Sequence, residues 1–370
     1  MNGVARLPLV AVDAECEVRR RLIEPELQVG ATQLVEPETV VAVAATGTEQ
    51  SVRIAVAVEL GVSPQEATRC LVRALGDRVE AGEVVAARRR GLRTFQVTSP
   101  IAGRLERFDE ETGSLVVVAE APRQPVRALV AGEVRAVQDD TLAIRVVGDL
   151  VQGTVLLGPE CAGPLVVLAD RVDRELPVEE FDERCRGAVV LAGMTVSSAA
   201  LRRLADVGAA GVLVGGLSLS ALEPLIGGRS GERMRQLVLT GEAAWPLSLG
   251  VLLLEGFGRL PLAEPVFSFL QERSGRWVSL LRAESVGLER PLALVSSRSF
   301  QGRPLEPVPL EAGIPVHVGI PARPGVGRLR SAPFRSRTFD GFMFPAVLVE
   351  RDGQVDQVPL DLVTPLGLNP

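Results

Sequence analysis

The sequence predicts a multidomain α/β plus β protein, in which β-rich segments flank a small parallel α/β domain. Up to residue 176, short runs of alternating apolar residues are bounded by glycine, proline and aspartate, as is typical of short antiparallel strands. Between residues 177 and 285, continuous apolar runs alternate with helical patterns, as expected for parallel strands covered by helices. The remaining residues are rich in proline and lack helical spacing.

With 370 residues the chain is too long for one compact core, so we expect several domains. We predict a β domain over 1–125 with a helix inserted near 63–75, a β-rich connector over 126–176, the α/β domain over 177–285, and a β-barrel over 286–370. The charged stretch "RELPVEEFDERCRG" marks the central boundary. No apolar run reaches the ~20 residues that a bilayer crossing needs, and no cleavable leader is visible, so we expect a cytoplasmic protein.

Composition excludes several chemistries. The sequence has no lysine, which excludes covalent biotin or lipoate, a Schiff base to PLP and a P-loop lysine. His317 is the only histidine, and Cys16, Cys70, Cys161 and Cys185 form no CxxC pair, so we expect neither a metal site nor a disulfide framework. The net charge of −6 gives no general reason to expect nucleic acid.

The N-terminal region contains two copies of one hairpin pattern, in "VGATQLVEPETVVAVAA" within Leu27–Ala45 and in "LGDRVEAGEVVAA" within Leu75–Ala87. Each copy runs through a turn, an apolar residue, a second turn and a valine-rich strand. Between the copies, Ser63-Pro64-Gln65-Glu66 is a capping box with proline at the first helical position. Helically spaced apolar residues then continue to Leu75, and Gly76 is the expected stop.

The segments "GDRVEAGEVVA" and "SPIAGRL" resemble the two pseudo-symmetric halves of a biotinyl/lipoyl-type barrel-sandwich hybrid. The resemblance implies a hairpin that presents a modified lysine, but the hairpin here reads Ala87-Arg88-Arg89-Arg90-Gly91. Unmodified members of this domain type occur in electron-transport subunits, polymerases and efflux adaptors, where they dock or support other parts. The resemblance therefore implies a docking module without a cofactor.

The α/β domain is predicted from four apolar strands at 188–192, 210–216, 249–254 and 277–281. We expect helices after Ser198, from a second capping box at Ser220-Ala221-Leu222-Glu223 to Gly227-Gly228, and over Pro265–Arg273. At the C-terminus, Asp352-Gly353 between apolar runs indicates a two-residue hairpin. The segment "GIPVHVGIPARPGVGRLRS" is similar to an SH3-like, KOW-type barrel.

Ligands of parallel sheets gather at the carboxyl ends of the strands, and three predicted loops qualify. Their candidate ligand-binding residues are Gly193, Thr195, Ser197, Gly215, Gly216, Ser218, Gly256, Gly258 and Arg259. Glu255 directly follows an apolar strand and is a candidate general base. The alternative is that these residues serve only as caps and tight turns, with Glu255 solvated or salt-bridged.

A second candidate is a basic stretch near the C-terminus. Arg323, Arg328, Arg330, Arg335 and Arg337 occur without an acidic neighbour, beside Phe334 and Phe339. This set suits phosphate contact and base stacking, although a solvated face, or one docked on the acidic N-terminal half, is the better explanation. His317 alternates with Val316 and Val318 in a predicted strand, and no catalytic partner is near it in sequence, so we expect a structural role.

These observations support three hypotheses. The first is a non-catalytic accessory or assembly protein that docks a protein partner through its unmodified module. The second is an α/β protein that binds a small anionic ligand or nucleotide and acts as an enzyme if Glu255 is catalytic. The third is an RNA- or ribosome-associated factor that uses the C-terminal arginines.

Overall fold

The computed structural model describes residues 4–45, 51–91, 93–119, 123–138, 140–226, 245–297, 301–319, 324–337 and 343–368. Most of its elements are strands. The chain divides into two compact units, with residues 1–21, 28–41 and 127–370 in unit 1 and residues 22–27 and 42–126 in unit 2. Residues 1–21 therefore belong to a different unit from residues 42–126, because they pair with strands of unit 1. This differs from the predicted single domain over residues 1–125.

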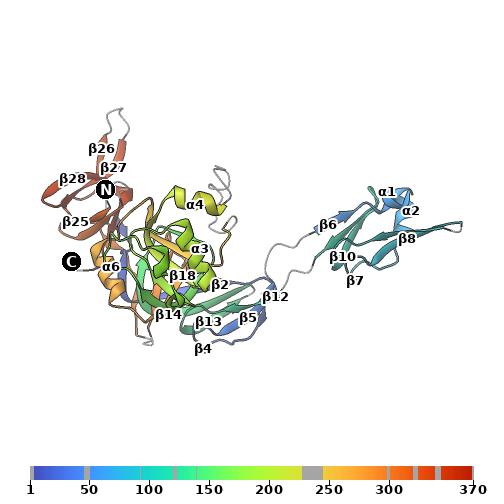
Figure 1. Ribbon diagram of the computed structural model, residues 1–370, viewed down its shortest axis with the longest axis horizontal. Helices are drawn as coiled ribbons and strands as arrows, with labels where there is room; N and C mark the ends of the chain where they lie inside the picture. Colours follow the sequence, from blue (N-terminus) through green and yellow to red (C-terminus); the bar gives the residue numbers. More distant parts are fainter. Residues whose placement is uncertain are drawn as a thin grey trace. The chain divides into compact units, whose positions relative to one another are not determined.

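Unit 2 is built from short strands and two short helices (Figure 1). One sheet has the order β6 (Ser51–Ile54), β11 (Ser114–Val118), β10 (Gly103–Asp109), β7 (Arg78–Val79), and β8 (Val84–Arg90) pairs with β9 (Arg93–Thr98). A third sheet has the order β12 (Arg123–Arg127), β5 (Val40–Ala45), β3 (Glu26–Leu27). The helices are α1 (Val56–Leu60) and α2 (Pro64–Arg69).

The predicted capping box forms, but its helix is shorter than expected. The Ser63 amide donates to Glu66 Oε2 at 3.2 Å, and this bond is the main reason why the pKa of the Glu66 carboxyl is lowered. The helix ends at Arg69 rather than near Leu75. The Val72 amide instead donates to the Val85 carbonyl at 3.0 Å, so sheet-type bonding to β8 ends the helix.

The two sequence copies share one strand register. Val79 of β7 lies opposite Gly103 of β10, and Val35 of β4 (Leu34–Val35) lies opposite Gly132 of β13 (Gly132–Gln138). Both second strands then bulge two residues after that glycine, between Leu105 and Arg107 and between Val134 and Ala136. A Cβ at Gly103 or Gly132 would lie 2.2 or 2.3 Å from a carbonyl oxygen of the next strand, so both positions require glycine.

The first copy therefore has its second half around β13, and residues 46–122 lie between its two halves in the sequence. The structure thus shows one copy of the pattern inserted into another. The sequence predicted the repeat but not this nesting.

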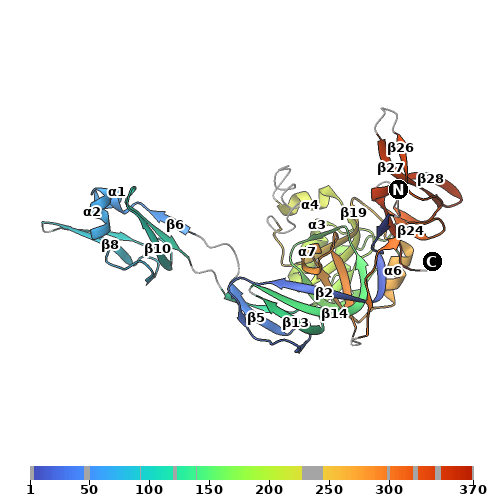
Figure 2. The ribbon, with the colours of Figure 1, turned by 180° about the vertical axis from the view of Figure 1, so that it is seen from behind.

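Unit 1 contains a twelve-stranded sheet with the order β15-β19-β18-β17-β16-β20-β21-β14-β13-β4, to which β2 and β22 also pair. Its remaining strands are β2 (Val10–Arg21), β14 (Thr141–Gln152), β15 (Val155–Leu157), β16 (Cys161–Val167), β17 (Val189–Leu191), β18 (Gly211–Leu217), β19 (Gly250–Phe257), β20 (Trp277–Leu281), β21 (Leu292–Ser296) and β22 (Arg303–Pro304). Strands β16 to β19 are parallel. Figure 2 shows β2, β13 and β14 at the end of this sheet away from α4.

Helices cover the parallel strands. One core cluster combines α3 (Ser198–Val207) and α4 (Leu219–Ile226) with β17, β18 and β19, and Figure 1 shows α3 close to β18. A second cluster combines α6 (Glu264–Gln271) with the other face of the same strands. The predicted strands and helices of this region are present, and α3 ends at Gly208 as expected. The second capping residue is Ser218 rather than Ser220, and Gly227-Gly228 lies outside the described residues.

The predicted boundaries at 176 and 285 do not separate sheets. Strand β20 was expected to be parallel, but it runs antiparallel to β16, and β20, β21 and β14 continue the sheet in antiparallel order. The short helix α7 (Ala283–Val286) lies between β20 and β21. A strand covered on both faces reads as a continuous apolar run in either direction, so the sequence carried no sign of this reversal.

The C-terminal sheet has the order β26-β27-β25-β24-β29, with β28 paired to β27. Its strands are β24 (Pro315–Val318), β25 (Gly325–Leu329), β26 (Phe334–Arg337), β27 (Met343–Arg351), β28 (Gln354–Pro359) and β29 (Val363–Pro365). The predicted hairpin at Asp352-Gly353 is confirmed, because both residues have positive φ, at 50° and 76°, as a two-residue turn of this type requires.

The smaller elements complete the described chain. Strands β1 (Ala5–Arg6) and β23 (Val308–Pro309) pair with each other, and three short 3-10 helices cover Val178–Glu180, Glu183–Cys185 and Leu360–Leu362. Within the described residues, no helix has the length and apolarity to cross a bilayer.

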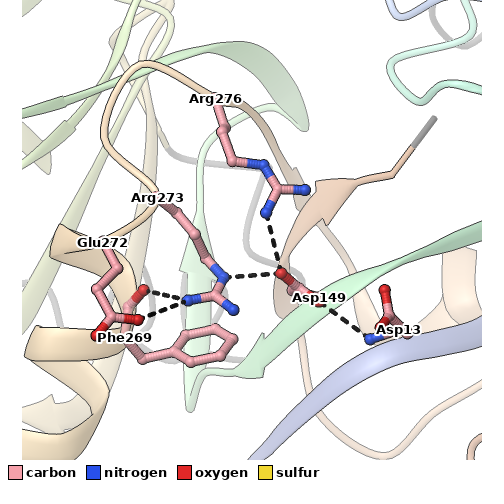
Figure 3. Close-up of polar contacts among 6 residues, drawn as sticks. All are labelled: Asp13, Asp149, Phe269, Glu272, Arg273 and Arg276. Atoms are coloured by element: carbon pink, nitrogen blue, oxygen red, sulfur yellow. Dashed lines mark hydrogen bonds and ion pairs between the residues drawn. The ribbon is translucent and has the colours of Figure 1, made fainter. Parts of the chain in front are cut away.

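A buried carboxylate ties three elements of unit 1 together (Figure 3). Asp149 of β14 is 5% exposed. Its Oδ2 accepts from Arg273 Nε at 2.8 Å and from Arg276 Nη1 at 3.1 Å, while its Oδ1 accepts from the Asp13 amide at 3.0 Å. The Arg273 guanidinium also lies 3.3 Å from the centroid of the Phe269 ring. The cluster joins β2 and β14 to the turn after α6.

We expect Asp149→Ala to destabilise unit 1 by about 3–5 kcal/mol, because it leaves the buried Arg273 charge with only the exposed Glu272 carboxylate, 3.6 Å away. Urea unfolding followed by fluorescence of Trp245 and Trp277 measures this change. Asp170→Ala is the control, because Asp170 pairs with Arg174 but its side chain is 67% exposed. Equal losses in the two variants would contradict the importance of the cluster.

Candidate functional site

The three loops predicted to hold a ligand do come together, but they bond to one another. The Gly215 amide donates to the Gly193 carbonyl at 2.9 Å, the Gly216 amide to the Met194 carbonyl at 2.8 Å, and the Gly258 amide to the Leu217 carbonyl at 2.9 Å. These three N–H groups, which were expected to face a ligand, therefore have backbone partners.

The glycines of these loops are explained by close packing. A Cβ at Gly215 would lie 2.1 Å from the Leu260 carbonyl oxygen, and one at Gly216 would lie 2.6 Å from that of Gly258. Gly193, Gly256 and Gly258 have φ of 82°, 129° and 132°, a region that favours glycine. Glycine at these positions therefore allows the loops to pack closely against each other's backbone.

The polar candidates of the same loops serve as caps and surface pairs. Ser197 Oγ accepts from the Ala200 amide at 3.1 Å at the start of α3, and Ser218 Oγ accepts from the Ala221 amide at 3.3 Å. Arg259 is 59% exposed and pairs with Glu175 at 2.7 Å. Thr195 is buried. The alternative of caps and turns therefore fits these residues better than a ligand site.

Glu255 has a different environment, because it forms a buried pair with His317. Glu255 lies near the end of β19 with its side chain 2% exposed, and its Oε2 is 2.7 Å from His317 Nε2 of β24. Its Oε1 accepts from the Ala263 amide at 3.1 Å, just before α6 begins. The pair joins the parallel strands to the C-terminal sheet, which supports the structural role expected for His317.

The sequence did not indicate this pairing, because the two residues are separated by 62 positions. Val316, His317 and Val318 are all buried. The alternation of polar and apolar residues in this strand therefore does not separate a buried face from an exposed one.

A cavity of about 740 Å³ lies close to this pair. Its polar lining consists of Arg6, Gln152, Glu289, Arg290, Asp361 and Thr364, contributed by segments far apart in the sequence. Cavities of this size accommodate small organic molecules. None of these six residues was a sequence candidate, since none belongs to a recognisable motif.

Arg290 connects the cavity to the buried pair. Burial lowers the pKa of the Arg290 guanidinium, and the charge of Glu255 opposes that shift. Arg290 Nη1 donates to Thr364 Oγ1 at 3.4 Å, and Thr364 lies opposite His317 in the pairing of β29 with β24. Among the described residues, this long bond is the only hydrogen bond found for the Arg290 side chain.

Arg6, Asp361 and Gln152 have firmer partners in this cavity. Arg6 Nη2 donates to Asp361 Oδ1 at 3.1 Å, and Arg6 Nη1 donates to the Val363 carbonyl at 3.1 Å. Gln152 Nε2 donates to the Pro8 carbonyl at 2.7 Å. Because Arg6 is balanced by Asp361, Arg290 is the guanidinium of this cavity with most donors available.

Cys161 and Cys16 are unsuited to nucleophilic chemistry near neutral pH. Burial raises the pKa of Cys161 to about 12 and that of Cys16 to about 11, with the charge of Glu15 adding to the shift of Cys16. Within the described part of the chain, no three His, Cys, Asp or Glu side chains gather in a way that could hold a metal ion.

Two of the described C-terminal arginines have partners of their own. Arg330 pairs with Glu350, and Arg328 Nη1 donates to the Gly313 carbonyl at 3.2 Å. Arg335 and Arg337 are exposed on β26, whereas Arg323 and Phe339 lie outside the described residues.

Comparisons with protein-family models, curated proteins and solved structures find no match for this chain.

We expect His317→Ala to lower the free energy of unfolding of unit 1 by about 1–3 kcal/mol, because the buried Glu255 carboxylate loses a hydrogen-bond partner. Tryptophan fluorescence in urea measures the loss. His317→Gln provides the control, since its amide can donate to the same oxygen and should restore part of the stability. If the two variants lose the same free energy, the hydrogen bond contributes nothing beyond packing.

Stability should fall as pH rises above about 9, because the unfolded chain ionises its thiols near that pH while folded Cys161 stays neutral until about 12. The unfolded state then binds fewer protons than the folded state, so the free energy of unfolding decreases with pH. Urea midpoints measured from pH 8 to pH 10 test this, with Cys161→Ala as the comparison. An equal slope in the variant would exclude Cys161 as a source of the effect.

Proposed function

We propose that this chain binds a small anionic molecule in the cavity of unit 1, with a carboxylate or phosphate of the ligand on Arg290. The observation that carries the proposal is the incomplete pairing of Arg290, a partly dehydrated guanidinium at a cavity wall with one hydrogen bond of 3.4 Å. A guanidinium has five N–H donors in a planar fork that matches a carboxylate or phosphate. An anion from solution can supply the missing acceptors.

The environment strengthens such a contact. Charge-assisted hydrogen bonds are about twice as strong as neutral ones, and partial removal of water lowers the local dielectric screening. The hydroxyl of Thr364, which lies next to Arg290, can share the same anionic group. Binding would therefore provide acceptors for the N–H groups of Arg290 that do not bond to Thr364.

The other charges of the cavity restrict the ligand class. Asp361 and Glu289 place two carboxylates on the lining, which disfavours a ligand with several negative charges. A molecule with one anionic group and a polar remainder that donates hydrogen bonds fits this lining best.

Glu255 has a positioning role in this proposal. Both of its oxygens accept hydrogen bonds, and its side chain is 2% exposed, so we assign it no proton transfer with a ligand. Its negative charge opposes the lowering of the Arg290 pKa by burial, and its bond to His317 positions the strand beside Thr364.

The second candidate is the accessory protein that docks a partner. It is favoured by the nested hairpin copies, in which a carrier-like pattern ends in arginines where the resembling family modifies a lysine. Purification from the native host should recover a partner in stoichiometric amount, and recovery of the chain alone would count against this candidate.

We expect a library of small carboxylates and phosphates to contain compounds that raise the melting temperature of the wild-type chain. Arg290→Met, which keeps the length of the side chain without its charge, should weaken the binding of such a compound by about 10- to 100-fold. Titration calorimetry measures the loss.

Arg259→Ala is the matched control, because Arg259 is exposed and already paired with Glu175, and it should bind like the wild type. The proposal fails if no compound stabilises the wild-type chain, or if Arg290→Met binds as tightly as Arg259→Ala.

A further inference from the structure

The hairpin of β8 and β9 ends in a cluster of arginines. Arg90 lies directly opposite Arg93 in the strand pairing, and Gly91 in the turn between them has φ of 64°. Arg89, Arg90 and Arg93 are all exposed. Figure 1 shows β8 extending past α1 and α2, away from the four-stranded sheet of unit 2.

The two faces of this ribbon both carry positive charge. Cross-strand partners share a face, so Arg90 and Arg93 lie on the face that begins with the buried pair Ala86 and Val97. Arg89 and its partner Thr94 lie on the opposite face.

The charges at the tip are not balanced within unit 2. Arg88 is occupied, because its Nη1 donates to the Gly61 carbonyl at 2.9 Å at the end of α1. Arg89 Nε makes one bond of 3.4 Å, to the Gly91 carbonyl. Across the described ranges, no carboxylate pairs with Arg89, Arg90 or Arg93, and the sequence from 84 to 105 contains no acidic residue.

Unit 1 shows the usual arrangement for comparison. There Arg145 lies between Glu133 and Glu17 on the neighbouring strands, and it also pairs with Glu15. Like charges placed directly opposite on paired strands are destabilising. The Arg90–Arg93 arrangement is therefore a local repulsion that an external anion would relieve.

We propose that this hairpin tip binds double-stranded DNA by entering a groove and contacting the phosphates on both sides. A two-stranded ribbon fits the major groove, which is ~12 Å wide. Arginines on both faces can reach both phosphate backbones that border a groove. A flat anionic surface, such as a lipid bilayer or an acidic protein face, would meet only one face of the ribbon.

This inference is independent of the Arg290 cavity, which lies among residues of unit 1. It also differs from the sequence-based nucleic-acid hypothesis, which placed the contact on the C-terminal arginines. Contacts of this kind are with phosphates, so they supply affinity without base specificity.

The test uses the full chain and a fluorescently labelled, mixed-sequence DNA duplex, with anisotropy recorded over a series of salt concentrations. The triple variant Arg89→Ala/Arg90→Ala/Arg93→Ala should bind at least ~10-fold more weakly at low salt, and its slope of log K against log salt should be shallower by about 2 to 3 units. The substituted side chains are exposed, so the melting temperature should stay unchanged.

The control is Arg171→Ala/Arg184→Ala/Arg186→Ala, which removes the same charge from exposed side chains of unit 1. It should retain duplex binding. The proposal is overturned if the wild-type chain does not bind the duplex at low salt, or if the control loses as much affinity as the hairpin variant. Equal or tighter binding to single-stranded DNA, polyglutamate or phosphatidylserine vesicles would also overturn it.

Discussion

A buried hydrogen bond between Glu255 and His317 lies where the large sheet of unit 1 meets its C-terminal sheet, beside the candidate site. It joins β19 of the parallel sheet to β24 of the C-terminal sheet. A buried carboxylate without a partner would be unfavourable, so this contact favours the observed meeting of the two sheets, together with the backbone bonds from Leu9 and Val10 to the Pro365 and Leu366 carbonyls. Thr364 and Arg290 line a cavity beside that junction. The charge of Glu255 opposes the lowering of the Arg290 pKa by burial.

Local signals in the sequence were sufficient for several elements. The capping box at Ser63, the glycine stop of α3 and the turn at Asp352-Gly353 depend on neighbouring residues, so short patterns specify them. The direction of β20 and the length of α2 depend on which strand is adjacent in space. The apolar patterns contain no information about either, and both predictions were therefore wrong.

Most of the candidate site could not be predicted from the sequence, because its residues are neighbours only in the folded chain. Glu255 was a candidate because it follows an apolar strand, and His317 had no visible partner nearby in the sequence, whereas the fold pairs the two from distant strands. Arg290, Arg6 and Thr364 belong to no motif and meet only because β1, β29 and the segment after α7 converge. The glycine loops that looked most like a ligand site are instead closed by their own backbone bonds.

The central claim is that Arg290 has hydrogen-bond donors available for an anion, and it is tested most directly by a crystal structure with a stabilising carboxylate or phosphate bound. The account predicts ligand oxygens within hydrogen-bonding distance of the Arg290 Nη atoms, with Glu255 still bonded to His317. Ligand density elsewhere, with the Arg290 guanidinium making no contact to it, would contradict the account.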